Sequence, residues 1–132
     1  MPRSWYPPHT DAGDKRYIGN VLIESNLPEV GTIVAFENHS GRTYLGPGCK
    51  PLGRSLIGGG NNGEDGTEGA VYKAAYGCYL HGSLLPKNPR FADLLLRQAL
   101  RRRHGDVELA PLHDTLEARA HASATERARA TR

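Results

Sequence analysis

Short apolar runs of strand length, each closed by polar residues or glycine, constrain the fold of this chain more than any other feature. One run covers residues 32–36 and is followed at once by the polar residues 37–39. Another covers residues 74–80 and leads directly into His81. Runs of this length suit buried strands and are short for helices. We therefore expect a sheet whose strands end in polar side chains.

Three further segments complete the predicted sheet. The β-forming residues 17–23 are interrupted by Gly19-Asn20, which predicts a bent strand or a short pair of strands. Ser40-Gly41 predicts a turn, after which residues 42–45 return as a second short strand. Residues 54–57 predict another strand, and the glycine-dense stretch that follows them predicts turns.

The clearest helix lies after the sheet. Asn88 is a residue that favours the N-cap, and Pro89 suits the first helical position. Residues 101–103 are three arginines, which suit a helix C-terminus, and Gly105 can end the helix. The apolar face of this helix is formed by Phe91, Leu94, Leu95, Gln98 and Ala99.

The chain of 132 residues is long enough for one domain with a core of its own. Residues 1–15 are rich in proline and polar residues and predict an irregular lead-in. Residues 16–105 carry the strand and helix patterns and form the predicted domain. Residues 106–132 predict a polar helical tail, whose apolar stripe consists of Leu112, Leu116 and Ala120. The fold class predicted from these segments is α/β.

Composition excludes several classes of function. The net charge of +3 comes mainly from arginines near the C-terminus, but no aromatic residue follows Phe91 to stack on bases, so nucleic-acid binding is not expected. Cys49 and Cys78 form no disulfide framework, and no Cys/His cluster has zinc spacing, so we expect no metal site. The sequence shows neither the apolar core of a signal peptide nor a stretch that could span a membrane. We expect a cytoplasmic, soluble protein without membrane insertion.

The glycine-rich loop at residues 58–63 fits the dinucleotide-binding pattern G-x-G-x-x-G in letter only. A dinucleotide site requires that this loop open an apolar helix whose N-terminus meets the pyrophosphate. Here Glu64, Asp65 and Glu68 follow instead, and they would repel phosphate. We therefore do not interpret the loop as a nucleotide site.

His81 is the strongest candidate for a catalytic side chain, because it lies where an apolar run stops and a glycine turn begins. A neutral imidazole at this place can take a proton from a thiol and return it to a leaving amine. Strand alternation points Cys78 and His81 to opposite faces, so Cys78 is predicted to be a small buried hydrophobe. Cys49 lacks the strand–turn–helix that a nucleophile elbow requires. A histidine that is merely hydrogen-bonded at a strand end is the structural alternative for His81.

Three ordered segments resemble one family. Residues 36–43 read Phe-Glu-Asn-His-Ser-Gly-Arg-Thr and resemble the Phe/Tyr-Glu-x-His-x-Gly-Arg signature of cobyric-acid-synthase-like class I glutamine amidotransferases. Residues 60–69, with Gly-Asn-Asn-Gly and Glu-Gly, resemble the next loop of one branch. Residues 77–89, with Gly-Cys-Tyr-Leu-His-Gly and Leu-Pro-Lys-Asn-Pro, resemble its catalytic-histidine segment. That branch is the glutaminase subunit of lipid II isoglutaminyl synthase.

The resemblance implies a fold, a reaction and a partner. The fold would be the C-terminal half of a flavodoxin-like amidotransferase sandwich, followed by the helical tail. The subunit would hydrolyse glutamine through a cysteine thioester, and a Mur-ligase-like partner would use ATP to activate the D-glutamate carboxyl of lipid II for amidation to isoglutamine. ATP would belong to the partner, so no cofactor is expected in this chain. A cobyric-acid relative is the alternative branch.

The resemblance also implies roles for individual residues. His81 aligns with the general base, and Arg16 with an arginine that binds the glutamine carboxylate. Glu37, His39 and Arg42 belong to the signature as a polar network, whose alternative role is to brace a strand end.

This sequence departs from the family in one important respect, because no Gly-x-Cys-x-Gly elbow is present in it. Ser83 stands where the wider class often has an acid, which the resembled class commonly lacks. We therefore expect the chain to be incomplete for catalysis and inactive alone. Two other interpretations of the chain stay open: a non-catalytic module that docks on the Mur-ligase-like partner, and a fragment that does not fold alone.

Overall fold

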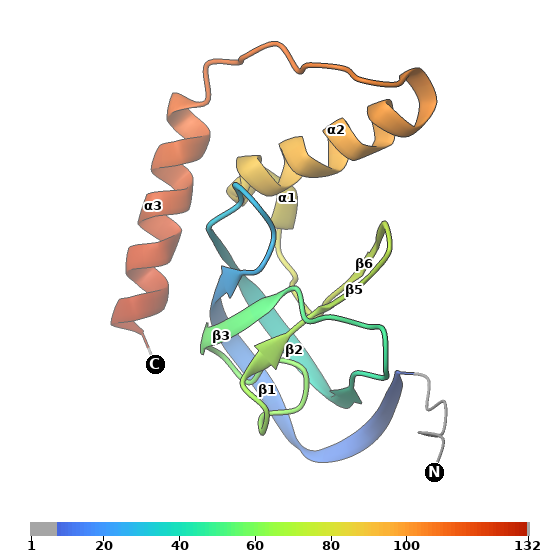
Figure 1. The fold of residues 1–132 in the computed structure, drawn as a ribbon. Coiled ribbons are helices and arrows are strands. Elements are labelled where there is room, and N and C mark those ends of the chain that lie inside the picture. Colours follow the sequence, from blue (N-terminus) through green and yellow to red (C-terminus); the bar gives the residue numbers. More distant parts are fainter. Residues whose placement is uncertain (1–7, 132) are drawn as a thin grey trace.

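The structure, a computed structural model, describes residues 8–131 and combines a sheet with helices (Figure 1). The chain first forms its strands and then its helices. The strands are β1 (His9–Ser25), β2 (Thr32–Tyr44), β3 (Gly53–Ile57), β4 (Thr67–Glu68), β5 (Ala70–Tyr72) and β6 (Ala75–Gly77). The helices are α1 (Leu84–Lys87), α2 (Pro89–His104) and α3 (Thr115–Ala130). This mixture of strands and helices agrees with the predicted α/β class.

The main sheet has the strand order β2-β1-β3-β4, and β5 and β6 form a separate hairpin. All pairings between these strands are antiparallel. Parallel strands, which a flavodoxin-like sheet requires, are therefore not found within residues 8–131.

Strands β1 and β2 are longer than the sequence pattern indicates. β1 begins at His9, so most of the predicted irregular lead-in that the structure describes is strand, and residues 1–7 lie outside the described residues. The predicted turn at Ser40-Gly41 is wrong, because β2 runs through it and Gly41 pairs with Ala12. The ladder extends because each strand offers the other a long edge, and such pairing overrides local turn preference. The irregularity in β1 is a register shift between Ala12 and Tyr17.

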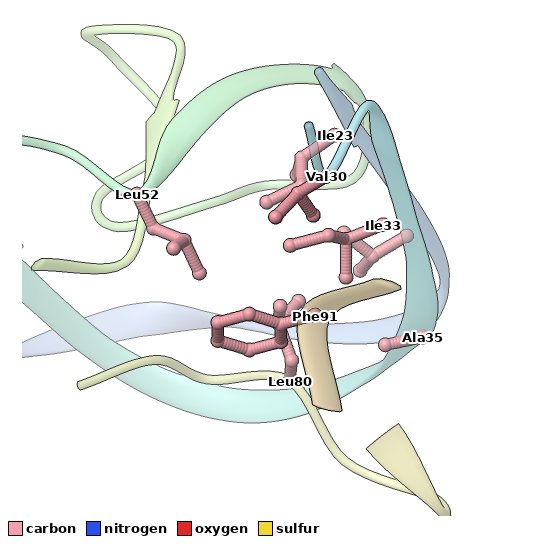
Figure 2. Packing of buried hydrophobic residues seen from close by; sticks show 8 residues of the cluster. Ile23, Val30, Ile33, Ala35, Leu52, Leu80 and Phe91 are labelled. Atoms are coloured by element: carbon pink, nitrogen blue, oxygen red, sulfur yellow. The ribbon is translucent and has the colours of Figure 1, made fainter. Parts of the chain in front are cut away.

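Both faces of the β1–β2 pair are buried, but against different helices. One face carries Ile23 and Ile33, which pack with Phe91 of α2 in the larger core (Figure 2). The other face carries Leu22 and Val34, which pack against α3. Because side chains alternate along a strand, neighbouring residues of one strand serve the two cores. The larger core consists of Val21, Ile23, Val30, Ile33, Ala35, Leu52, Leu80 and Phe91.

The two predicted helices are present, with a different buried face in the second. α2 begins after Asn88 and ends before Gly105, whose φ of 79° favours glycine. α3 lies within the predicted tail, but Leu112 and Leu116 of the predicted stripe are 76% and 71% exposed. The residue that α3 buries is Ala128, since a small side chain lets the helix approach the sheet closely.

Substitution of Ala128 by aspartate is expected to detach α3 from the sheet. A carboxylate at a fully buried position facing Leu22 and Val34 would lie in an apolar environment without a partner. We expect a loss of about 2–3 kcal/mol in the free energy of unfolding, measured by urea denaturation. Ala130→Asp, at an exposed position of the same helix, is the matched control. Equal midpoints for the two variants would contradict the observed docking of α3.

Candidate functional site

The main chain of His81 is held at the outer edge of β2. The N–H of His81 donates to the carbonyl of Phe36 at 2.7 Å, and the N–H of Phe36 donates to the carbonyl of His81 at 3.3 Å. The strand predicted over residues 74–80 is only partly present, as β6 ends at Gly77. His81 is therefore placed by one isolated bridge to Phe36, and its side chain is exposed.

A left-handed turn follows His81. Gly82 has φ of 72° and Ser83 has φ of 56°, and both begin the turn into α1. Glycine adopts this conformation freely, whereas a residue with a side chain pays a cost in energy. Two successive left-handed residues reverse the chain sharply, so His81 lies at a corner between strand edge and helix.

The side chain of Asn88 makes the hydrogen bonds to the edge of β2 that a neighbouring strand would otherwise make. Its amide donates to the carbonyl of Val34 at 2.8 Å, and its oxygen accepts from the N–H of Val34 at 2.9 Å. The same amide nitrogen donates to the carbonyl of Leu84 at 2.7 Å. Asn88 is 2% exposed and does not cap α2 with its side chain, contrary to the sequence-based expectation. It thus ties the turn after His81 to β2.

Arg16 and His81 lie on one face of the β1–β2 pair. Arg16 donates from Nε to Asn38 Oδ1 at 2.8 Å. Asn38 shares a face of β2 with Phe36, two residues away, and cross-strand partners such as Phe36 and His81 point to the same side. We call this surface the open face and define it by Arg16, Ile18, Phe36, Asn38 and His81.

The open face continues the surface that α3 covers further along the strands. α3 ends beside Asn20, whose amide donates to Thr131 at 2.9 Å. Beyond that point Ile18 is 62% exposed and Phe36 is 37% exposed. A hollow lined in part by Ile18, Leu56 and Arg129 opens next to them. His81, the candidate base, and Arg16, the candidate carboxylate-binding residue, are also exposed on this face.

The signature residues Glu37 and His39 lie on the opposite, buried face of β2. Glu37 accepts hydrogen bonds from the N–H groups of Gly59 at 2.8 Å and Gly60 at 3.3 Å. His39 Nδ1 bonds the carbonyl of Gly41 at 3.1 Å, and its Nε2 lies 3.5 Å from the Glu37 carboxylate. Glu37 thus holds the glycine-rich loop against β2, and His39 lies beside it on the face away from His81.

Arg42 joins the same network through hydrogen bonds to main-chain carbonyls. Its guanidinium donates to the carbonyls of Lys15, Ser40 and Gly41. The guanidinium carbon also lies 4.2 Å from the centre of the Tyr17 ring, a cation–π geometry. These contacts connect β1 and β2 where their register shifts. The geometry favours a bracing role for this part of the signature.

Tyr79 and Glu68 extend the buried network toward His81. The Tyr79 ring stacks on His39 with centroids 3.8 Å apart, and its N–H donates to Glu68 at 2.8 Å. Sequence reasoning missed both residues as functional candidates. The available signal was the position of Tyr79, two residues before His81 in the histidine segment.

Burial raises the pKa of Glu68 from its ordinary 4.5 to about 7. The hydrogen bond from the N–H of Tyr79 lowers this pKa, and the nearby charge of Glu37 raises it further. Stability from this group is therefore present below pH 4.5 and is lost as pH rises through about 7. Glu68→Gln removes this titration. Between pH 4.5 and a pH above the raised pKa, we expect the unfolding free energy of the variant to gain about 3 kcal/mol relative to the parent. Urea denaturation across this range measures it, with exposed Glu126→Gln as the control, and parallel pH profiles would contradict it.

The cysteines offer no activated thiol near His81. Cys78 is exposed, so its prediction as a buried hydrophobe is wrong; the chain leaves β6 before Cys78 and the assumed strand alternation does not apply. Desolvation by surrounding atoms nevertheless raises the pKa of the Cys78 thiol, and the Glu68 charge adds to this. A raised pKa disfavours the thiolate that attacks a carboxamide. Cys49 lies in the loop before β3, at intermediate exposure.

The part of the chain that the structure describes also bears on metal binding and membrane insertion. No group of three or more His, Cys, Asp and Glu residues there is arranged to hold a metal ion. No helix among residues 8–131 is long and apolar enough to cross a membrane.

Comparison with known proteins places these features in a family context. A family model described as a CobB/CobQ-like glutamine amidotransferase domain matches residues 4–89. The chain is 47% identical over 95 residues to the lipid II isoglutaminyl synthase (glutamine-hydrolyzing) subunit GatD of Staphylococcus aureus (strain N315), covering 72% of this chain and 37% of that protein. It is 40% identical over 104 residues to the subunit of the same name from Streptococcus pneumoniae (strain ATCC BAA-255 / R6), covering 78% of this chain and 40% of that protein. The chain thus spans about two fifths of the length of these relatives.

Proposed function

The chain belongs to the family of CobB/CobQ-like glutamine amidotransferase domains, and from this premise we propose that it forms part of a glutaminase subunit. The subunit supplies ammonia for amidation of the D-glutamate of lipid II to isoglutamine. The observation that carries the proposal is the open face, where Arg16 of β1 and His81 at the outer edge of β2 are both exposed. The names of the two relatives support the choice of lipid II over a cobyric-acid substrate.

His81 acts in this proposal as the general base. Its neutral imidazole takes the proton of a cysteine thiol, which then attacks the carboxamide carbon of glutamine. The imidazolium returns the proton to the departing ammonia, and water hydrolyses the resulting thioester. The bridge to Phe36 and the turn at Gly82 support this role, because they fix the main chain while leaving the imidazole exposed.

The nucleophile in this proposal lies outside the 132 residues. Cys78 is disfavoured by its raised thiol pKa, and Cys49 lacks a strand–turn–helix around it. The relatives are more than twice as long as the region they share with this chain, which leaves room for a cysteine segment.

Arg16 binds the substrate carboxylate in this proposal. Its guanidinium can donate two parallel hydrogen bonds to the α-carboxylate of glutamine, a bidentate pair that favours arginine over lysine. The contact from Nε to Asn38 supports the assignment, because it fixes the plane of the guanidinium on the open face. Arginine at this position therefore selects a substrate with a free α-carboxylate.

The proposed partner is a Mur-ligase-like subunit that binds ATP and activates the lipid II carboxyl. The relatives are named as subunits of a synthase, which supports a complex with a second protein. The chain itself needs no cofactor for glutamine hydrolysis by a Cys–His pair. We propose the cytoplasmic side of the membrane as its location, where ATP is available to the partner.

Ammonia release from glutamine tests the proposal. A protein that contains these residues together with the cysteine segment should release ammonia, and with the ligase subunit, ATP and lipid II it should convert the D-glutamate carboxyl to a carboxamide. Arg16→Lys should raise KM for glutamine about tenfold, since a bidentate pair is lost. Arg54→Lys, which changes an exposed arginine paired with Glu24, is the control. Amidation driven equally well by free ammonia and never by glutamine would refute the proposal.

A further inference from the structure

Tyr79 is held through its ring, its hydroxyl and its main chain. The ring stacks on His39 at 3.8 Å between centroids, with an angle of 1° between the planes. The hydroxyl shares a hydrogen bond of 2.8 Å with Thr43 Oγ1. The N–H donates to the buried carboxylate of Glu68 at 2.8 Å. Three different parts of this residue are therefore fixed by neighbours from β2 and β4.

The residues that follow Tyr79 have much weaker support. Leu80 contributes to the core, but His81 makes only the isolated bridge to Phe36, and Gly82 starts a left-handed turn. The bridge fixes His81 to β2 at one residue, so the direction from which the chain reaches the bridge depends on the residues before it. The last side chain before the candidate base that is held by both stacking and a hydrogen bond is therefore Tyr79, and Leu80 between them packs in the core.

We propose that Tyr79 and Glu68 are positioning residues that set the place of His81 on the open face. Glu68 holds the N–H of Tyr79, while His39 and Thr43 hold its side chain, so that His81 meets Phe36 in one register. This inference rests on the proposed function for its catalytic meaning, but its structural content is independent of it. It also gives the buried signature residue His39 a role in the site, through the opposite face of β2.

The carboxylate of Glu68 makes this restraint depend on pH. Glu37 acts on it from β2 through its charge, the N–H of Tyr79 donates to it from the histidine segment, and its own charge acts on the Cys78 thiol. Burial places the pKa of Glu68 at about 7. A charged acceptor bonds an N–H more strongly than a neutral one. The restraint on Tyr79 is therefore tighter above this pH and looser below it.

Hydrogen exchange in the purified 132-residue chain measures the restraint directly. The N–H of His81 is bonded to Phe36, so its protection reports how firmly His81 is docked. Glu68→Leu removes the acceptor of Tyr79 and should lower the protection of the His81 amide about tenfold, while Glu68→Gln, which keeps an acceptor, restores most of it. The amide of Ile23, in the centre of the larger core, should keep its protection in both variants.

A second pair of variants serves if Glu68→Leu does not fold. Tyr79→Phe removes the hydroxyl bond to Thr43 and keeps the stacked ring, whereas Tyr76→Phe removes a comparable bond to Gln98 away from His81. Only the first should lower the protection of the His81 amide. The chemical shift of the Tyr79 amide should also titrate with a midpoint near pH 7 in the parent and not in Glu68→Gln. Unchanged His81 protection in Tyr79→Phe, with no such titration, would overturn the inference.

Kinetics separate this inference from the proposed function. In a protein that hydrolyses glutamine, Tyr79→Phe should lower kcat with KM unchanged, because the base and not the substrate is displaced. Absence of glutaminase activity in every variant would refute the proposed function and leave the exchange results intact. Normal glutaminase activity with an unaltered His81 amide would refute the positioning role alone.

Discussion

Replacement of His81 by alanine is expected to lower kcat for glutamine hydrolysis by about 100-fold to 10,000-fold. This loss is the usual contribution of general acid–base catalysis by a positioned side chain. The structure gives the reason for assigning the role to His81, since its main chain is fixed by Phe36 and its side chain is exposed on the open face. KM for glutamine should change little, because the imidazole acts on the thiol and the leaving amine. Steady-state ammonia release in the complete protein measures both constants.

His104→Ala is the matched control for this prediction. His104 is also exposed, but it lies at the C-terminal end of α2. Its removal should leave kcat and KM unchanged. A loss of less than about tenfold in His81→Ala would mean that another group takes the proton, and the proposed role of His81 would then be wrong.

Asn88→Leu is expected to lower the free energy of unfolding by about 3–5 kcal/mol. Leucine has a similar volume but leaves three main-chain groups, the N–H and carbonyl of Val34 and the carbonyl of Leu84, without the hydrogen bonds that Asn88 makes. Each buried polar group left unpaired costs about 1–3 kcal/mol. The turn after His81 should loosen at the same time, because Asn88 is its tie to β2. Urea denaturation monitored by circular dichroism gives the change in free energy.

Asn26→Leu provides a control of the same chemistry. Asn26 is exposed and makes one side-chain hydrogen bond, to the carbonyl of Pro51 at 3.3 Å. Its replacement should change stability by less than about 0.5 kcal/mol, as is usual for surface substitutions. Similar midpoints for both variants would show that the edge of β2 does not depend on Asn88.

The parts of the fold that follow from local chemistry could be predicted from sequence. α2 has a favourable first turn at Pro89, basic residues in its last turn and Gly105 after its end, so its bounds were correct. The apolar run at residues 32–36 lies within β2 and supplies residues to both cores. These signals operate within a few residues and do not depend on the rest of the chain.

The parts that depend on long-range pairing could not be predicted. The extension of β2 through Ser40 and Gly41 needs the partner residues of β1, which local turn preference does not include. The buried face of α3 depends on the sheet surface that it meets, so Ala128 is buried while Leu116 remains exposed. Because α3 has few large apolar residues, its hydrophobic periodicity does not indicate which face of the helix is buried.

The candidate site shows the same division. The position of His81 after an apolar run indicates a catalytic side chain at the end of a strand. In the structure that strand is short, and His81 instead forms an isolated bridge to the edge of β2. Arg16 was chosen only by resemblance, and the register of β1 and β2 brings it to the same face. The sequence indicates Glu68 only as an acidic residue of the loop that resembles the family, because its burial and its bond to Tyr79 arise from the fold.

The most direct test of the central claim is ammonia release from glutamine by the purified chain, alone and mixed with a segment that supplies the nucleophilic cysteine. The account predicts no release from the chain alone, release on addition of the segment, and loss of that release in His81→Ala. Release by the chain alone that disappears in Cys78→Ser would contradict the proposal that the nucleophile lies outside these residues. No release in any mixture that is shown to assemble would contradict the assignment of His81 as the base.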